Sequence, residues 1–143
     1  ANTLLNKHSG LSGVSGISSD MRDVIESAKD GSPNAQLAFE MYCYRLSKYI
    51  GGYAAAMGGL DHIIFTGGIG ENSAQVRETT CDKLGFMGVL LDKEKNSSVK
   101  GIEAEISTID SKIKVMVIPT NEELVIARDT LGLVKEENNK FVL

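Results

Sequence analysis

The chain contains one long segment with helical periodicity, flanked by shorter patterns. From Asn34 to Met57 the apolar side chains recur in steps of three and four residues, the spacing of an amphipathic helix. These apolar positions are Leu37, Ala38, Met41, Tyr42, Leu46, Tyr49, Ile50, Tyr53, Ala54 and Met57. Gly58 and Gly59 follow directly, so the pattern predicts one helix over 34–57.

The shorter patterns predict alternating helices and strands. The apolar run Asp61–Thr66, bounded by glycines, predicts a strand buried on both faces. The other predicted elements are a loop with at most one short strand over 9–19, a helix over 20–28, a glycine turn over 67–73, a helix over 73–84, strands over 88–91, 103–108 and 114–118, a helix over 119–133 and a frayed tail over 135–143. This order is typical of an α/β fold, with ligand chemistry at strand ends.

The length of the chain sets the domain organisation. A chain of 143 residues is long enough for one domain and too short for two. The roughly four strands predicted are few for a central α/β sheet. We therefore expect a single partial domain over 1–143, with an incomplete sheet and flanking helices. The chain also begins at Ala1 without an initiator Met, as expected for a segment of a longer protein.

Composition excludes several classes of protein. The net charge of -4 gives no excess of positive charge for a nucleic-acid backbone. The most apolar region, Ile50–Phe65, is interrupted by glycines, Asp61 and His62, so we expect no membrane span. Cys43 and Cys81 lack the spacing of a zinc site or a disulfide framework, which favours reduced thiols and a cytoplasmic protein.

The strongest local signal for ligand binding is the glycine-rich segment Thr66–Asn72. Glycines between a buried strand and a helix allow backbone N–H groups to approach an anion or a ring closely, which indicates nucleotide binding. The segment is neither a dinucleotide fingerprint, which needs Gly where Ser73 stands, nor a Walker motif, which needs a Lys after its last glycine. A tight strand-to-helix turn without a ligand is the alternative.

Two further segments carry candidate chemistry at predicted helix starts. Arg22 is suited to stack on a base or to pair with a phosphate, and Asp20 to accept from a ribose hydroxyl. The alternative for this pair is a helix cap with a surface ion pair. Glu122 is a candidate Mg²⁺ ligand, because Mg²⁺ prefers oxygen donors, although acidic residues in a first turn also offset the helix dipole.

Four segments together resemble the C-terminal part of the acetate kinase family. They are Ser12–Asp23 (SGVSGISSDMRD), Tyr53–Asp61 (YAAAMGGLD), Phe65–Ser73 (FTGGIGENS) and Val117–Leu124 (VIPTNEEL). They occur in the order and at the separations of that family, and the similarity extends to about Thr130. Propionate kinases share much of this pattern.

The resemblance implies a fold, a reaction and a set of site residues. The family has a ribonuclease H-like fold of the sugar kinase, actin and Hsp70 superfamily, and it transfers phosphoryl from ATP to acetate with Mg²⁺, giving acetyl phosphate and ADP. The residues that match its nucleotide site are Asp20, Met21, Arg22, Gly68, Ile69, Gly70, Glu71 and Asn72, and Glu122 matches its Mg²⁺ site. Its catalytic residues precede the part present here, so none is assigned and the chain alone is expected to be inactive.

The resemblance leaves alternatives for the role of this chain. The parent protein is an acetate kinase or a propionate kinase, since the carboxylate pocket lies in the part that precedes this chain. The family forms homodimers through its C-terminal domains, and the small-residue segment Gly51–Gly59 suits close helix packing. A dimerisation module without independent ligand binding is therefore the second hypothesis.

Overall fold

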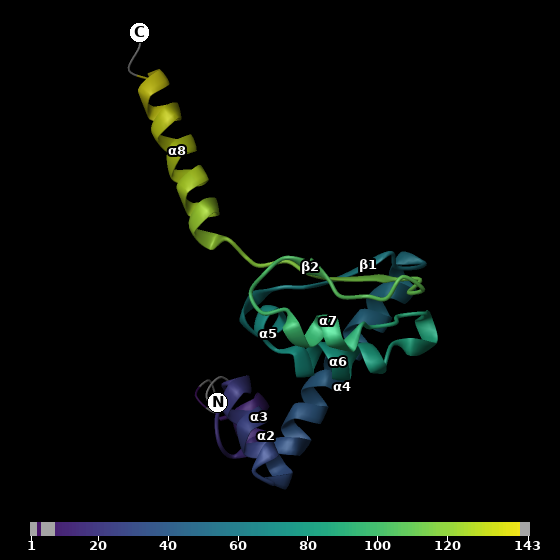
Figure 1. Cartoon of the computed structure of the whole chain (residues 1–143). Helices are drawn as coiled ribbons and strands as arrows, with labels where there is room; N and C mark the ends of the chain where they lie inside the picture. The colour runs from purple at the N-terminus through teal and green to yellow at the C-terminus, as the bar shows by residue number, and fades with distance from the viewer. Residues whose placement is uncertain (1–2, 4–7, 141–143) are drawn as a thin grey trace.

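The computed structural model describes residue 3 and residues 8–140, and side-chain surroundings up to residue 135. The predicted α/β architecture is confirmed as a small mixed sheet with helices against one face (Figure 1). The elements from residue 10 onward are α2 (Gly10–Ser15), α3 (Met21–Lys29), α4 (Pro33–Met57), β1 (His62–Phe65), α5 (Gly67–Asn72), α6 (Ala74–Asp82), η1 (Gly85–Met87), α7 (Lys93–Ser98), β2 (Ala104–Glu105), β3 (Lys114–Val117) and α8 (Glu122–Lys140).

The sheet has three strands in the order β1-β3-β2, rather than the four expected. β1 and β3 run parallel, with Ile63 opposite Val115, and β2 pairs antiparallel with β3. The strand predicted over 88–91 contributes an isolated bridge between Leu91 and Ser107. Since β1 and β3 are parallel, both carboxyl ends lie at one edge, where α5 and α8 begin.

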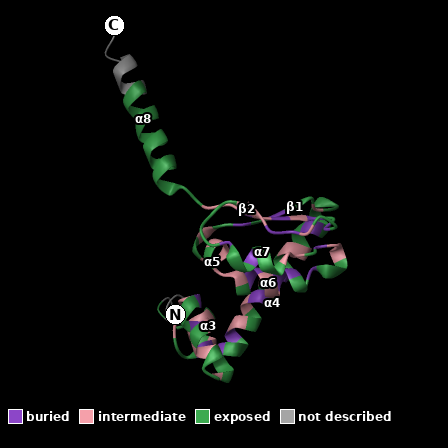
Figure 2. Cartoon of the chain, in the orientation of Figure 1, coloured by how far each residue is buried: buried purple, intermediate pink, exposed green. Residues whose placement is uncertain are grey.

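The main core lies on the helix-covered face of the sheet. It combines inward strand residues with side chains from α4, α6 and the loops that follow, including Phe65, Leu84, Ile106 and Val115. Figure 2 shows this buried layer under the strands. The opposite face is open, because Ile64 of β1 is 53% exposed, so the expectation of a strand buried on both faces was wrong.

A second core cluster joins α3, the first half of α4 and α6. Met21 and Val24 of α3 pack with Ala35, Ala38 and Val76. Leu11 and Val14 of α2 lie against the same cluster, and this tertiary packing explains why residues 10–15 form a helix and not the predicted loop. The cluster holds the start of α3 in place.

The helices differ in how well the sequence predicted their extent. The predictions for α3, α4 and α6 are confirmed within a few residues. Residues 67–72 form the short helix α5 where a turn was expected, and α7 was not expected at all. α8 continues to Lys140 instead of ending at Leu133, and residues 141–143 of the expected tail lie outside the described residues.

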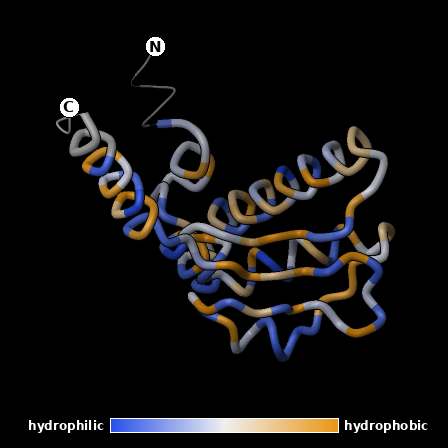
Figure 3. Tube along the Cα trace, turned by 90° about the horizontal axis from the view of Figure 1, so that it is seen from above, coloured by the Kyte–Doolittle hydropathy of each residue, from blue (hydrophilic) through white to orange (hydrophobic). Residues whose placement is uncertain are grey.

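The last helix projects away from the rest of the molecule. Figures 1 and 3 show α8 extending beyond the sheet edge, and its side chains up to residue 135 are exposed. Its exposed apolar residues include Ile126 and Leu133. In the part of the chain that the structure describes, no helix is long and apolar enough to cross a bilayer.

Candidate functional site

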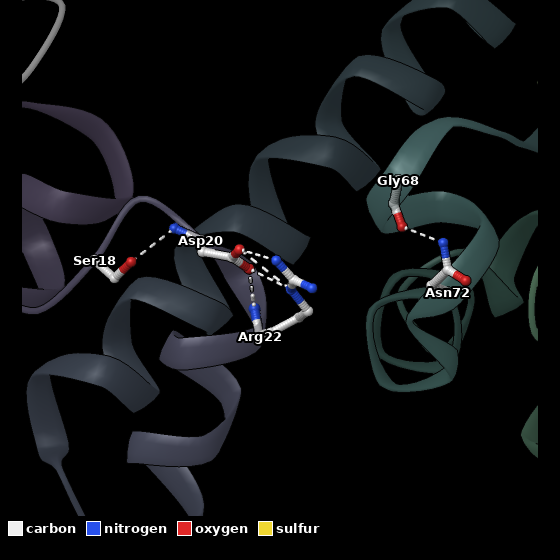
Figure 4. A network of polar contacts seen from close by, with 5 residues as sticks. All are labelled: Ser18, Asp20, Arg22, Gly68 and Asn72. Atoms are coloured by element: carbon white, nitrogen blue, oxygen red, sulfur yellow. Dashed lines mark hydrogen bonds and ion pairs between the residues drawn. The ribbon is translucent and has the colours of Figure 1, made fainter.

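A cavity of about 920 Å³ separates the start of α3 from α5 and the start of α6. Its volume lies in the range of small-molecule sites. It is lined by Ser19, Asp20, Met21, Arg22, Ile25, Gly68, Ile69, Asn72, Ser73, Ala74, Gln75 and Lys100. Figure 4 shows Asp20 and Arg22 on one side and Gly68 and Asn72 across from them.

Asp20 and Arg22 form a forked ion pair at the start of α3. Asp20 is the N-cap and accepts from the Arg22 backbone N–H at 2.8 Å. The Arg22 Nε and Nη2 atoms also donate to the Asp20 carboxylate, Nη2 at 2.6 Å, and these hydrogen bonds lower the pKa of Asp20 to about 2. The cap and surface ion pair considered as an alternative are thus both present, while the Arg22 side chain remains 89% exposed.

Serines before α3 shape the backbone that leads into the site. The Asp20 N–H donates to Ser18 Oγ at 3.0 Å. The buried Ser15 accepts from the Ile17 N–H at 3.1 Å, and its hydroxyl donates to the Ser18 carbonyl. The serine-rich segment therefore serves as a hydrogen-bonded turn that presents Asp20.

The glycines of α5 have different structural roles. Gly67 adopts φ +70°, the left-handed region that glycine favours. A Cβ on Gly70 would approach the Phe65 carbonyl carbon to 3.2 Å, so this glycine allows α5 to pack on the end of β1. A Cβ on Gly68 would meet no atom within 4 Å, and Gly68 lines the cavity. Of the three, Gly68 is the one left for a ligand.

We expect Gly68→Ala to separate binding from stability. Alanine is favoured over glycine in a helix by about 1 kcal/mol, so the midpoint of urea unfolding should stay the same or rise. Its methyl group would occupy the cavity wall. If ADP is the ligand, as the sequence predicts, its affinity should fall by about tenfold, which a calorimetric titration measures. Gly67→Ala is the control, because strain at positive φ should lower stability. Unchanged ADP affinity in Gly68→Ala would contradict this assignment.

The cavity favours an anionic ligand with an apolar portion. Asp20 and Arg22 cancel each other's charge, whereas Lys100 makes no ion pair within the described part of the chain. The first turns of α3 and α6 add the positive ends of two helix dipoles. Ile25 and Ile69 supply apolar lining.

A buried arginine that the sequence did not indicate binds the backbone next to the cavity lining. Arg77 of α6 is fully buried. It donates to the carbonyls of Gly70, Glu71, Asn96 and Val99 and to Asn96 Oδ1, at 2.7–2.9 Å. The Asn96 amide in turn donates to the Ala74 carbonyl at 2.9 Å. The guanidinium thereby joins the end of α5 to α7 and to the turn that carries Lys100.

The structure brings together six of the nine residues assigned to the site from the sequence. Asp20, Met21, Arg22, Gly68, Ile69 and Asn72 line the cavity. Gly70 and Glu71 do not, since Gly70 faces Phe65 and the Glu71 carboxylate accepts from Gly67 and Thr120. These hydrogen bonds lower the pKa of Glu71, with the Thr120 backbone N–H the largest cause. Glu122 lies outside the cavity, in the first turn of α8.

Glu122 provides little of a metal site by itself. Within residues 3 and 8–140 no group of three or more His, Cys, Asp or Glu side chains is placed to hold a metal ion. The neighbouring Asn121 side chain already accepts from the Leu124 N–H at 3.0 Å. This donor set suits only an ion that brings other ligands with it, as Mg²⁺ bound to phosphates does.

The family model and the most similar relatives of this chain agree on one family. A family model described as the Acetokinase family matches residues 1–128. The acetate kinase of Bacteroides thetaiotaomicron is 56% identical over 133 residues, which is 93% of this chain and 33% of that protein. That of Halothermothrix orenii is 58% identical over 132 residues, 92% of this chain and 33% of that protein. The chain thus spans about a third of these relatives.

Solved structures show the same similarity. The crystal structure of Porphyromonas gingivalis acetate kinase matches with a TM-score of 0.86 and 48% identity, covering 93% of this chain and 33% of that one. A propionate kinase from Francisella tularensis matches with a TM-score of 0.79 and 42% identity, covering 88% of this chain and 32% of that one.

Proposed function

We propose, because this chain belongs to the acetokinase family, that it is the nucleotide-binding portion of a kinase that transfers a phosphoryl group from ATP to acetate. The observation that carries the proposal is the cavity itself. Segments far apart in the sequence, Asp20–Arg22 and Gly68–Asn72, contribute to one hollow of ligand size. Both segments carry the residue types that predict nucleotide binding from the sequence.

The chemistry of the lining supports ATP or ADP as the ligand. Ile25 and Ile69 offer apolar surface to a base. Arg22 has a planar guanidinium suited to stacking or to phosphate, and the Asp20 carboxylate is an acceptor for a ribose hydroxyl. Asn72 holds the Gly68 carbonyl through its side-chain N–H at 2.9 Å, which stiffens the opposite wall.

The metal proposed for the parent enzyme is Mg²⁺, with Glu122 as its protein ligand. The exposed first turn of α8 leaves this carboxylate accessible. The ion, when bound, neutralises charge on the transferred phosphoryl group. Glu122 would orient the nucleotide's metal-bound phosphates, and no catalytic residue is assigned within this chain.

We propose that this domain has the ribonuclease H-like fold of the sugar kinase, actin and Hsp70 superfamily. The small mixed sheet, with helices on one face and the other face open, supports it as a partial domain. The acetate would be bound by a region of the parent kinase that corresponds to the part of the relatives that this chain does not cover. Propionate is the second candidate acid, because the similarity to a solved propionate kinase is nearly as close.

We also propose a cytoplasmic homodimer. The second half of α4 presents Tyr53 and Met57, each 64% exposed, beside small residues that permit close packing. The buried thiols of Cys43 and Cys81 are unpaired, and burial raises the pKa of Cys81 to about 12, which suits a reducing compartment where ATP is plentiful. A structural module that only dimerises is the rival hypothesis.

A calorimetric titration with MgADP tests the proposed function. We expect saturable binding to the unmodified chain and about tenfold weaker binding to Arg22→Ala, the effect of one charge-assisted contact. Arg45→Ala is the matched control, since Arg45 is another exposed arginine, on α4, whose contact is with Tyr49. Equal affinity in all three proteins, or no binding to the unmodified chain, would contradict the proposal.

A further inference from the structure

Glu71 is assigned to the site from the sequence, but its carboxylate binds backbone and side-chain groups outside the cavity lining. One oxygen, Oε1, accepts three hydrogen bonds: from the Gly67 N–H at 2.8 Å, the Thr120 N–H at 2.7 Å and the Thr120 hydroxyl at 3.0 Å. A single atom therefore joins two segments that are 49 residues apart in the sequence.

On the side of the cavity, Glu71 completes the start of α5. The N-cap residue Thr66 makes no side-chain cap bond to the helix. The Gly67 N–H, one of the groups without a partner inside the helix, is satisfied by Glu71 instead. The same oxygen that holds Thr120 thus also holds the first residue of the glycine-rich helix.

On the other side, Glu71 holds the connection between β3 and α8. The strand end is tied down by the Ile118 N–H, which donates to the Phe65 carbonyl at 3.0 Å. Pro119 has no N–H to donate, so Thr120 is the next anchoring point. Because α8 is exposed along its described side chains, the segment before it determines where the helix points.

We propose that Glu71 is a positioning residue that couples the nucleotide cavity to α8, and so sets the place of Glu122 relative to a bound nucleotide. The inference rests on the proposed function and concerns the same site. Glu122 follows Thr120 by two residues, and it is not among the residues that line the cavity beside Gly68. The Glu71 bridge is the polar side-chain link between them.

The positioning role of Glu71 depends on its oxygen as a hydrogen-bond acceptor and not on its negative charge. Gln at position 71 keeps a carbonyl oxygen at the place of Oε1 and can accept the same bonds, whereas Ala cannot. Glu71→Gln should therefore behave like the unmodified chain, and Glu71→Ala should not. Glu105→Ala is the control, since Glu105 is another surface carboxylate with polar partners, Lys114 and Ser107, away from the cavity.

The first measurement follows α8 directly and needs no nucleotide. Spin labels at Lys83→Cys and Arg128→Cys report the distance between α6 and α8, and the native cysteines are buried. We expect at least a twofold broader distance distribution in Glu71→Ala, and unchanged widths in Glu71→Gln and Glu105→Ala. An unchanged width in Glu71→Ala would overturn the positioning role.

The second measurement asks whether the bridge matters to the ligand. We expect Glu71→Ala to lose the gain in ADP affinity that Mg²⁺ gives the unmodified chain, while its affinity for adenosine stays within about twofold. Equal weakening for adenosine and MgADP would show a disturbed cavity and overturn the coupling. Absence of binding to the unmodified chain would refute the nucleotide proposal and, with it, the coupling to nucleotide, whereas the distance measurement would still decide the role of Glu71 in placing α8.

Discussion

Replacing Arg77 with Met should destabilise the chain by about 3–5 kcal/mol, a large part of the total for a domain of this size. The substitution removes the guanidinium that donates to the carbonyls of Gly70, Glu71, Asn96 and Val99. The Glu71 and Asn96 carbonyls keep a backbone donor each, whereas those of Gly70 and Val99 lose their side-chain partner. Each unpaired buried acceptor costs about 1–3 kcal/mol before relaxation. Urea unfolding followed by circular dichroism measures the loss.

Two further variants keep this prediction testable. Arg77→Met can fail to accumulate as folded protein, so Asn96→Ala, which removes one acceptor and the donor to Ala74, should show a smaller loss of about 2 kcal/mol. Arg128→Met on the exposed α8 should change stability by less than about 0.5 kcal/mol. If Arg77→Met and Arg128→Met have the same midpoint of urea unfolding, the proposed role of Arg77 is contradicted.

The second large effect concerns activity. The 143-residue chain should form no acyl phosphate from acetate and MgATP above the rate without protein. Phosphoryl transfer depends on positioning and on stabilising charge around the phosphoryl group. In the described residues Glu122 stands outside the cavity, and Lys100 is the one lining cation without an ion pair.

A hydroxamate assay measures the acyl phosphate, with the acetate kinase of Bacteroides thetaiotaomicron as positive control. Turnover that rises with the concentration of the chain and disappears in Arg22→Ala would contradict the expected inactivity.

The elements that the sequence predicts well are those in which local pattern and burial agree. The helix α4 carries its apolar residues at regular steps, and Gly58, with φ +75°, ends it as expected. The segment Met21–Lys29 likewise begins at the cap Asp20. In these cases a local signal is sufficient, because packing does not oppose it.

The failures have a common physical cause, which is dependence on distant contacts. Leu11 and Val14 form a helix because α3 and α4 cover them, and nothing within residues 9–19 records that packing. Ile64 is exposed because the described part of the chain covers one face of the sheet, although its sequence suits burial on both. The short α7 carries six residues, all of them polar, so it has no apolar period to indicate a helix.

The sequence indicated part of the cavity lining, but not the lining residues Ile25 and Lys100 or the supporting Arg77. Asp20–Arg22 and Gly68–Asn72 have recognisable residue types at helix starts. Arg77 was missed because arginine is usually exposed. A signal was present, however, since Arg77 falls on the same face of α6 as the buried Thr80 and Cys81, at i+3 and i+4.

The most direct test of the central claim is an amide chemical-shift map of the isotope-labelled chain during titration with MgADP. The account predicts saturable shifts at Asp20–Ile25 and Gly67–Gln75, the two walls of the cavity. The groove on α4 formed by Met41–Tyr49 should be unaffected. Shifts centred on that groove, or none at millimolar ADP, would contradict the claim that this chain carries a nucleotide site between α3 and α5.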